Sequence, residues 1–83
     1  MNIIVYTKTG CPWCKGVLDL LNGRKIPYEE RNVLIDPVYM DELIKKSAQT
    51  KTPTLDIDGA IIADSDKEQV EAYLKEKGVI PKE

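Results

Sequence analysis

Histidine is absent from this sequence, and cysteine occurs only twice among its 83 residues. A chain without histidine cannot form a Ser-His-Asp or Cys-His nucleophile pair, and it has no imidazole to bind a metal. Two cysteines are also too few for a closed zinc site of four Cys or His ligands within one chain. We therefore expect no resident metal, and the candidate chemistry has to come from the two thiols.

Other common features are missing as well. No apolar run approaches the roughly 18 residues of a membrane span, and the five glycines are scattered instead of forming a phosphate-binding loop. The net charge is only −2, and lysines alternate with acids along the chain. We expect neither a nucleic acid nor a membrane as a partner. Because the N-terminus does not begin like a signal peptide, we expect a cytoplasmic protein.

The composition itself is that of a globular domain. Hydrophobic residues make up 42% of the chain and charged residues 31%, as in ordinary folded proteins. A chain of this length has room for only one core. We therefore expect residues 1–83 to form a single domain.

Apolar periodicity and start signals predict seven elements in the order β-α-β-α-β-β-α, with one right-handed βαβ unit followed by a hairpin. Asp36-Pro37 predicts one helix start, and Ser65 to Glu68 matches a capping box. The charged second strand is expected at an edge of the sheet. The predicted elements are a strand at 2–6, a helix at 12–23, a strand at 28–33, a helix from 37, strands at 54–57 and 60–63, and a helix from the capping box to Gly78.

Both cysteines lie in Cys11-Pro12-Trp13-Cys14, at the junction of the first predicted strand and helix. Residues i and i+3 of a first helical turn are about 5–6 Å apart, close enough for a disulfide. The helix N-terminus favours a thiolate at Cys11. We expect Cys14, one turn further, to be more buried and less acidic. The spacing thus predicts Cys11 as the nucleophile and Cys14 as the resolving thiol.

Three alternative roles of the cysteine pair remain open. The first is a structural disulfide, which is typical of secreted chains with several cysteines. The second is a pair of buried structural cysteines, although the strand–helix junction exposes the first of them. The third is binding of a metal or an iron–sulfur cluster, which would require a second chain or an outside thiol. Thiol–disulfide exchange fits the motif and its position better than any of these roles.

Taken together, the Lys8 to Cys14 segment, the later Thr52-Pro53 and the element order resemble a glutaredoxin of the thioredoxin superfamily. Trp13 stands where the family commonly has tyrosine, which keeps a flat aromatic beside the thiols. The resemblance implies an α/β, thioredoxin-like fold with a four-stranded mixed sheet in the order 2-1-3-4 and three helices on its two faces. It also implies reduction of protein disulfides and glutathione mixed disulfides by a monomer, with glutathione as co-substrate and no bound cofactor.

The resemblance also implies a substrate site. Thr52-Pro53 matches the family's Val-Pro, whose proline is cis, and the backbone of Thr52 is expected to pair with that of the substrate. Ser65 and Asp66 match the pair that holds the γ-glutamyl end of glutathione. Gln49 replaces a basic residue that contacts the glycine carboxylate. Lys8, Pro12 and Trp13 complete the residues expected at the glutathione site.

Two positions depart from the family pattern. Ala63 and Asp64 replace a Gly-Gly pair, so that a side chain stands where backbone should approach glutathione. This departure keeps open a role for Ser65 and Asp66 as helix caps alone. It also keeps open a glutaredoxin-like electron donor that thioredoxin reductase reduces, as for some partners of ribonucleotide reductase.

Rivals from other classes are an iron–sulfur carrier of two cluster-bridged chains, which Pro12 disfavours, and a binding module with incidental cysteines. Among the remaining residues, we expect Asp56 to be at least partly exposed, and Tyr6 is a candidate to lie near the thiols.

Overall fold

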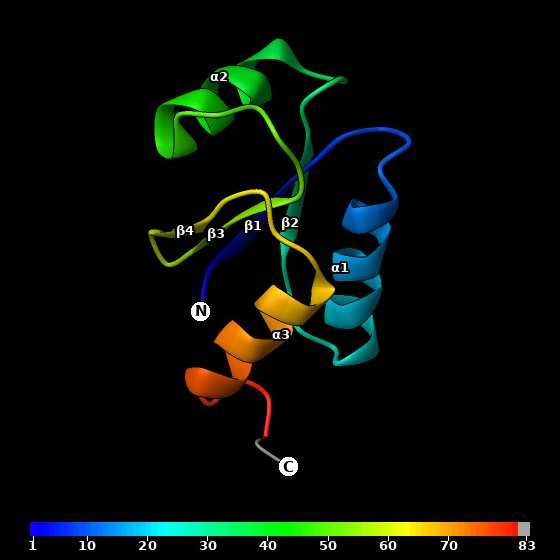
Figure 1. Ribbon diagram of the computed structural model, residues 1–83, viewed down its shortest axis with the longest axis vertical. Helices are drawn as coiled ribbons and strands as arrows, with labels where there is room; N and C mark the ends of the chain where they lie inside the picture. Colours follow the sequence, from blue (N-terminus) through cyan, green and yellow to red (C-terminus); the bar gives the residue numbers. More distant parts are fainter. Residues whose placement is uncertain (82–83) are drawn as a thin grey trace.

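The computed structural model describes residues 1–81, which form one sheet and three helices (Figure 1). The strands are β1 (Ile3–Thr7), β2 (Glu29–Asn32), β3 (Thr54–Ile57) and β4 (Ala60–Ile62), and the helices are α1 (Pro12–Gly23), α2 (Pro37–Ser47) and α3 (Lys67–Glu76). The predicted order is confirmed, with strand ends shifted by one residue. No helix within residues 1–81 is long and apolar enough to cross a membrane.

The sheet has the strand order β2-β1-β3-β4. β1 is parallel to β2 and antiparallel to β3, and β3 is antiparallel to β4. Helices α1 and α3 cover one face and α2 covers the other (Figure 1). This arrangement is the thioredoxin-like fold, with the order 2-1-3-4 and the charged strand at an edge, as expected from the sequence. Because β1 is central, the loop that follows it starts from a rigid position.

Short local signals set the helix starts. Proline occupies the first turn of α1 and of α2, where a missing N–H costs no hydrogen bond. The Asp36 carboxylate caps α2 by accepting the Val38 amide N–H. The predicted capping box of α3 is wrong in its first residue: Asp66 is the cap and accepts the Gln69 N–H, whereas Ser65 is buried. Ser65 does not cap the helix because its hydroxyl donates a hydrogen bond to the backbone carbonyl of Pro53 instead.

The two faces of the sheet have different cores. On one face, strand residues such as Val5 and Leu55 pack against helix residues such as Leu21 and Leu74 in a large apolar cluster. The α2 face has a smaller cluster centred on Leu43. Strand alternation explains the division, because successive side chains of β1 point to opposite faces.

A charged network supplements the small cluster on the α2 face. The buried Tyr6 hydroxyl donates to Glu42 at 2.8 Å and accepts from Lys46 at 2.7 Å. Lys46 also pairs with Asp56 at 2.8 Å, and Glu42 pairs with Arg31 of β2. Asp56 is partly exposed, as expected. Tyr6, however, faces α2 instead of the thiols, because alternation along β1 sends it to the other face.

Candidate active site

The candidate site begins where β1 ends. Residues 8–10 form the turn into α1, and the Cys11 amide donates to the carbonyl of Lys8 at 3.2 Å. Gly10 has a φ of +81°, in the left-handed region that glycine adopts without steric cost. The turn therefore delivers Cys11 directly to the start of a helix.

Cys11 and Cys14 are joined by a disulfide, with their Cα atoms 5.3 Å apart. Cys14 is buried at 3% exposure, whereas Cys11 is half-buried. The Cys11 sulfur accepts the Cys14 amide N–H at 3.1 Å, which makes it the cap of α1. In the reduced state this hydrogen bond and the positive end of the helix dipole favour a thiolate on Cys11. Pro12 and Trp13 are exposed beside the sulfur atoms.

Thr52-Pro53 forms the wall on one side of the disulfide. The peptide bond between them is cis, which confirms the expectation for this pair. The Cys11 sulfur lies 3.7 Å from the Thr52 hydroxyl oxygen and 3.8 Å from the Thr52 carbonyl oxygen. Thr52 thus stands beside the more exposed of the two sulfur atoms.

Two predicted site residues make hydrogen bonds that hold this wall. The Pro53 carbonyl accepts both the amide and the hydroxyl of Ser65, each at 2.9 Å. The Gln49 side chain donates to Ser47 at 2.7 Å and to Thr54 at 3.1 Å, and its carbonyl oxygen accepts an amide of the same loop. Ser65 and Gln49 therefore connect the Thr52-Pro53 segment to α3 and α2.

The remaining predicted residues lie around the same segment. Asp66 caps α3. Asp64 has a φ of +49°, a conformation that favours glycine, and aspartate tolerates it better than most residues. Its carboxylate pairs with Lys51 at 3.8 Å between two exposed side chains. Lys8 is half-buried in the loop before Cys11. The structure thus brings Thr52 beside Cys11 and Ser65 against Pro53, and it leaves the other side of the disulfide open.

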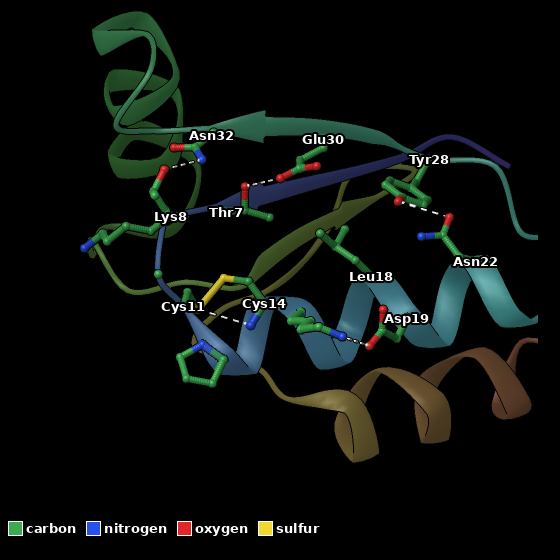
Figure 2. A pocket seen from close by; sticks show the side chains of 14 residues that line it. Thr7, Lys8, Cys11, Cys14, Leu18, Asp19, Asn22, Tyr28, Glu30 and Asn32 are labelled. Carbon is green, nitrogen blue, oxygen red and sulfur yellow. Dashed lines mark hydrogen bonds and ion pairs between the residues drawn. A yellow bond between two sulfur atoms is a disulfide. The ribbon is translucent and has the colours of Figure 1, made fainter.

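A groove of about 720 Å³ opens on that other side, between α1 and β2 (Figure 2). Both cysteines and Lys8 line one end of it. Pro12, also a predicted site residue, lies in the lining as well, and sequence reasoning missed the residues that remain. A signal was present: Tyr28, just before β2, and Glu30 and Asn32 within it alternate along the chain, and none is the aliphatic residue that a covered strand face requires. The groove lining comprises Thr7, Lys8, Thr9, Gly10, Cys11, Pro12, Cys14, Lys15, Leu18, Asp19, Asn22, Tyr28, Glu30 and Asn32.

Lys15, the charged residue next to Cys14 in sequence, is held by an acid of its own helix. Lys15 follows Cys14 directly but forms an ion pair with Asp19 at 2.7 Å. The hydrogen bond from Lys15 to that carboxylate holds the pKa of the Lys15 ammonium above its ordinary value. Within residues 1–81, no group of three or more acidic, Cys or His side chains could hold a metal ion. The chemistry of the described site therefore centres on the two sulfur atoms and their neighbours.

Comparison with known proteins gives a consistent result. A sequence model of the glutaredoxin family matches residues 3–62. A glutaredoxin-like 8.6 kDa protein from the rubredoxin operon of Clostridium pasteurianum is 30% identical over 73 residues, which cover 88% of this chain and 97% of that protein. Glutaredoxin 3 of Escherichia coli K12 is 31% identical over 65 residues, or 78% of each chain.

A solved structure is similar in both sequence and fold. The thioredoxin-like protein BC3987 superposes with a TM-score of 0.78 at 33% identity, over 84% of this chain and 96% of its own. The family match covers most of the chain and includes the strand–helix junction and the Thr52-Pro53 segment. The chain therefore belongs to the glutaredoxin family, as a redox protein with the thioredoxin fold.

Proposed function

We propose that this chain is a dithiol glutaredoxin that reduces protein disulfides and glutathione mixed disulfides through Cys11 and Cys14. The observation that carries the proposal is the Cys11–Cys14 disulfide at the start of α1, with the Cys11 sulfur against Thr52. The half-buried Cys11 suits the attacking role, and the buried Cys14 suits the resolving role.

The reaction consists of two exchanges. The Cys11 thiolate attacks one sulfur of the substrate disulfide, so that a Cys11–substrate disulfide forms and the other substrate sulfur leaves as a thiolate. The Cys14 thiol then loses its proton to solvent and attacks the Cys11 sulfur. This step releases the second substrate thiolate and forms the Cys11–Cys14 disulfide. Two electrons have passed from the dithiol to the substrate, and each released thiolate takes up a proton according to its pKa.

Glutathione is the proposed reductant of the resulting disulfide. One glutathione thiolate attacks Cys11 and releases Cys14, and a second attacks the bound glutathione, which leaves the dithiol and oxidised glutathione. Support comes from the backbone of Thr52, which lies beside Cys11 and offers an extended cysteinyl ligand a short strand pairing. We propose that the protein acts as a monomer in the cytoplasm, without a bound cofactor, since exchange needs only the thiols.

A specific observation favours a second candidate, an electron donor that thioredoxin reductase reduces. The Gln49 amide is engaged by Ser47 and Thr54, at the two ends of its own loop. The Asp64 carboxylate stands beside Lys51, so it would both repel a glutathione carboxylate and compete for that lysine. Both features weaken the expected contacts to glutathione, while leaving Cys11 and Cys14 available to a protein partner.

The reductants can be compared directly. The oxidised protein is mixed with glutathione, or with NADPH and thioredoxin reductase, and the rate of dithiol formation is measured by trapping with an alkylating reagent. We expect rapid reduction by glutathione. Rapid reduction by the reductase together with none by glutathione would overturn the first candidate in favour of the second.

The roles of the two cysteines are tested with single variants. We expect Cys14→Ser to retain turnover of a glutathionylated peptide, because Cys11 alone takes and returns the glutathione. Cys11→Ser should lose all exchange activity, since Cys14 is buried at 3% exposure. Equal activity of the two variants would contradict the assignment of nucleophile and resolving thiol.

A further inference from the structure

The disulfide has two flanks, and only one of them is explained by the proposed glutathione reaction. Thr52-Pro53 lies on the first flank. The groove between α1 and β2 begins at the same two cysteines and extends along the second flank to Tyr28 and Asn22 (Figure 2). None of its described lining residues comes from the 49–66 segment. A ligand held by Thr52 would therefore leave the groove unoccupied.

The groove is open because the sheet ends there. β2 pairs with β1 alone, and its charged residues offer no apolar face for a helix to cover. The apolar stripe of α1 turns to the large core through Val17, Leu20 and Leu21. What remains is a channel with a strand as one wall and a helix as the other. Because the groove runs along a strand from the cysteines to Tyr28, it suits an extended polypeptide better than a compact small molecule.

Glu30 supplies the specific chemistry of this groove. Its carboxylate accepts a hydrogen bond at 2.8 Å from the hydroxyl of Thr7, which is buried at 2% exposure. This bond anchors the carboxylate at the floor of the groove. The other acid of the lining, Asp19, is neutralised by Lys15. Glu30, in contrast, makes no ion pair within residues 1–81.

Lys8 stands at the other end of the groove, near the disulfide, but its side chain extends away from the groove (Figure 2). It lies in the loop that precedes Cys11 and lines the mouth. Like Glu30, it forms no ion pair among the described residues. The carboxylate of Glu30 is therefore the charge that the groove itself offers to a ligand.

We propose that the groove binds an extended segment of a disulfide-bearing protein substrate, and that a Lys or Arg of this segment pairs with Glu30. The segment carries the cysteine that Cys11 attacks, so the groove continues the reactive site. In an extended segment, side chains alternate with a rise of about 3.3 Å per residue, so every second residue faces β2. A basic residue on that face, a few positions from the cysteine, meets Glu30. The inference rests on the proposed exchange activity but not on glutathione as its reductant.

The test uses two short peptide disulfides that differ only in carrying lysine or glutamate at every second position, starting two residues from the cysteine. The chemically reduced wild-type protein is mixed with each peptide, and the rate constant for reduction is measured in a single turnover. We expect the basic peptide to react about fivefold faster at low ionic strength, as for a partly exposed ion pair, and the preference to shrink in high salt.

Charge reversal at Glu30 provides the decisive variant. We expect Glu30→Lys to invert the preference between the two peptides. Glu76→Lys is the matched control, because it makes the same change of net charge at the exposed far end of α3 and should leave the preference intact. An equal shift in both variants, or no preference in the wild-type protein, would overturn the groove proposal alone. Failure to reduce either peptide would overturn the exchange activity as well.

A second measurement keeps the inference testable if Glu30→Lys does not fold. The Cys14→Ser protein is trapped as a mixed disulfide with the basic peptide, and its amide NMR shifts are compared with those of the free variant. We expect changes along the groove at Asn22, Tyr28 and Glu30. Changes confined to the neighbourhood of Thr52 would place the peptide on the other flank and overturn the inference.

Discussion

The two faces of the sheet are held together by different forces. On the face that carries the reactive cysteines, α1 and α3 bury a large apolar cluster around Leu21 and Leu74. On the opposite face, α2 buries little beyond Leu43 and is tied to three strands by the network of Tyr6, Glu42 and Lys46.

This difference matters for the site, because each face supplies one part of it. The apolar face positions the helix that begins at Cys11. The charged face positions α2 and, through the loop that follows it, Thr52. Apolar burial is insensitive to salt and pH near neutrality, whereas ion pairs respond to both. Cys11 therefore depends on the half of the molecule held by apolar burial, and Thr52 depends on the half held by ion pairs, which respond to salt and pH.

Truncation of one fully buried leucine on each face should give the largest contrast. We expect Leu21→Ala to lower the free energy of unfolding by about 4 kcal/mol, because the surrounding cluster cannot collapse onto the cavity. Leu43→Ala should cost about 2–3 kcal/mol, since its smaller cluster relaxes more readily. Urea unfolding of the disulfide form measures both values. Equal losses would show that the two faces do not differ in packing.

Removal of one hydroxyl should break the charged network. Tyr6→Phe keeps the buried ring but takes away the group that joins Glu42 to Lys46. We expect a loss of about 1–3 kcal/mol, because both partners lose a hydrogen bond in a partly buried place. Tyr39→Phe is the control on the same face, and it should change stability by less than about 0.5 kcal/mol. An unchanged free energy of unfolding in Tyr6→Phe would show that the network does not stabilise the α2 face.

The stability of the α2 face should depend on pH, because the network on that face contains two carboxylates with shifted pKa values, Glu42 and Asp56. The hydrogen bond from Tyr6 and the interactions with Arg31 hold the pKa of Glu42 below its usual value, although partial burial opposes the shift. Partial burial likewise opposes ionisation of Asp56, but the hydrogen bonds from Lys46 and from the Gly59 amide outweigh it and lower the pKa. Stabilisation by such acids is complete above their unfolded-state pKa of about 4 and disappears as the pH falls through the folded-state values.

Tyr6 and Lys46, which lose a proton at high pH, set the upper pH limit of the network's stability. Burial, which disfavours the phenolate, raises the pKa of Tyr6. For Lys46, partial burial works against the ammonium, but the hydrogen bonds to Asp56 and Tyr6 outweigh it and raise the pKa. Their stabilisation is complete below the unfolded-state values of about 10 and is lost as the pH rises through the folded-state values. The network is therefore strongest between about pH 5 and pH 9.

The smallest predicted effect compares acid sensitivity in two proteins. From pH 6 to pH 3, the wild-type protein should lose about 1 kcal/mol more unfolding free energy than Glu42→Gln, whose side chain does not titrate. Urea unfolding at the two pH values gives the difference. Identical losses in both proteins would mean that the acid response of the molecule comes from outside the α2 face.

Several parts of the fold and the site could be predicted from local sequence. Cys11 and Cys14 are separated by one helical turn, so their disulfide needed no long-range information. Asp36-Pro37 and Asp58-Gly59 set a helix start and a hairpin by their own backbone preferences. The cis bond before Pro53 was expected only from the resemblance to glutaredoxins, since most bonds before proline are trans.

The failures share a physical cause. Ser65 satisfies a local capping pattern, yet its hydroxyl binds the Pro53 carbonyl, a partner 12 residues away in sequence. Tyr6 lies close to Cys11 in sequence but on the opposite face, because side chains alternate along β1. At the groove, the polar alternation of Tyr28, Glu30 and Asn32 indicated an uncovered strand face, but the groove itself depends on where α1 packs against the sheet, which local sequence does not set.

The sequence by itself determined the groups available for chemistry: two cysteines one turn apart at a helix start, and no histidine beside them. These are short-range properties, carried by spacing and composition. Only the tertiary structure decided what surrounds the sulfur atoms, with Thr52 on one flank and the groove to Glu30 on the other. Those surroundings join segments that are distant along the chain, and their contacts arise from packing and strand order instead of local preference.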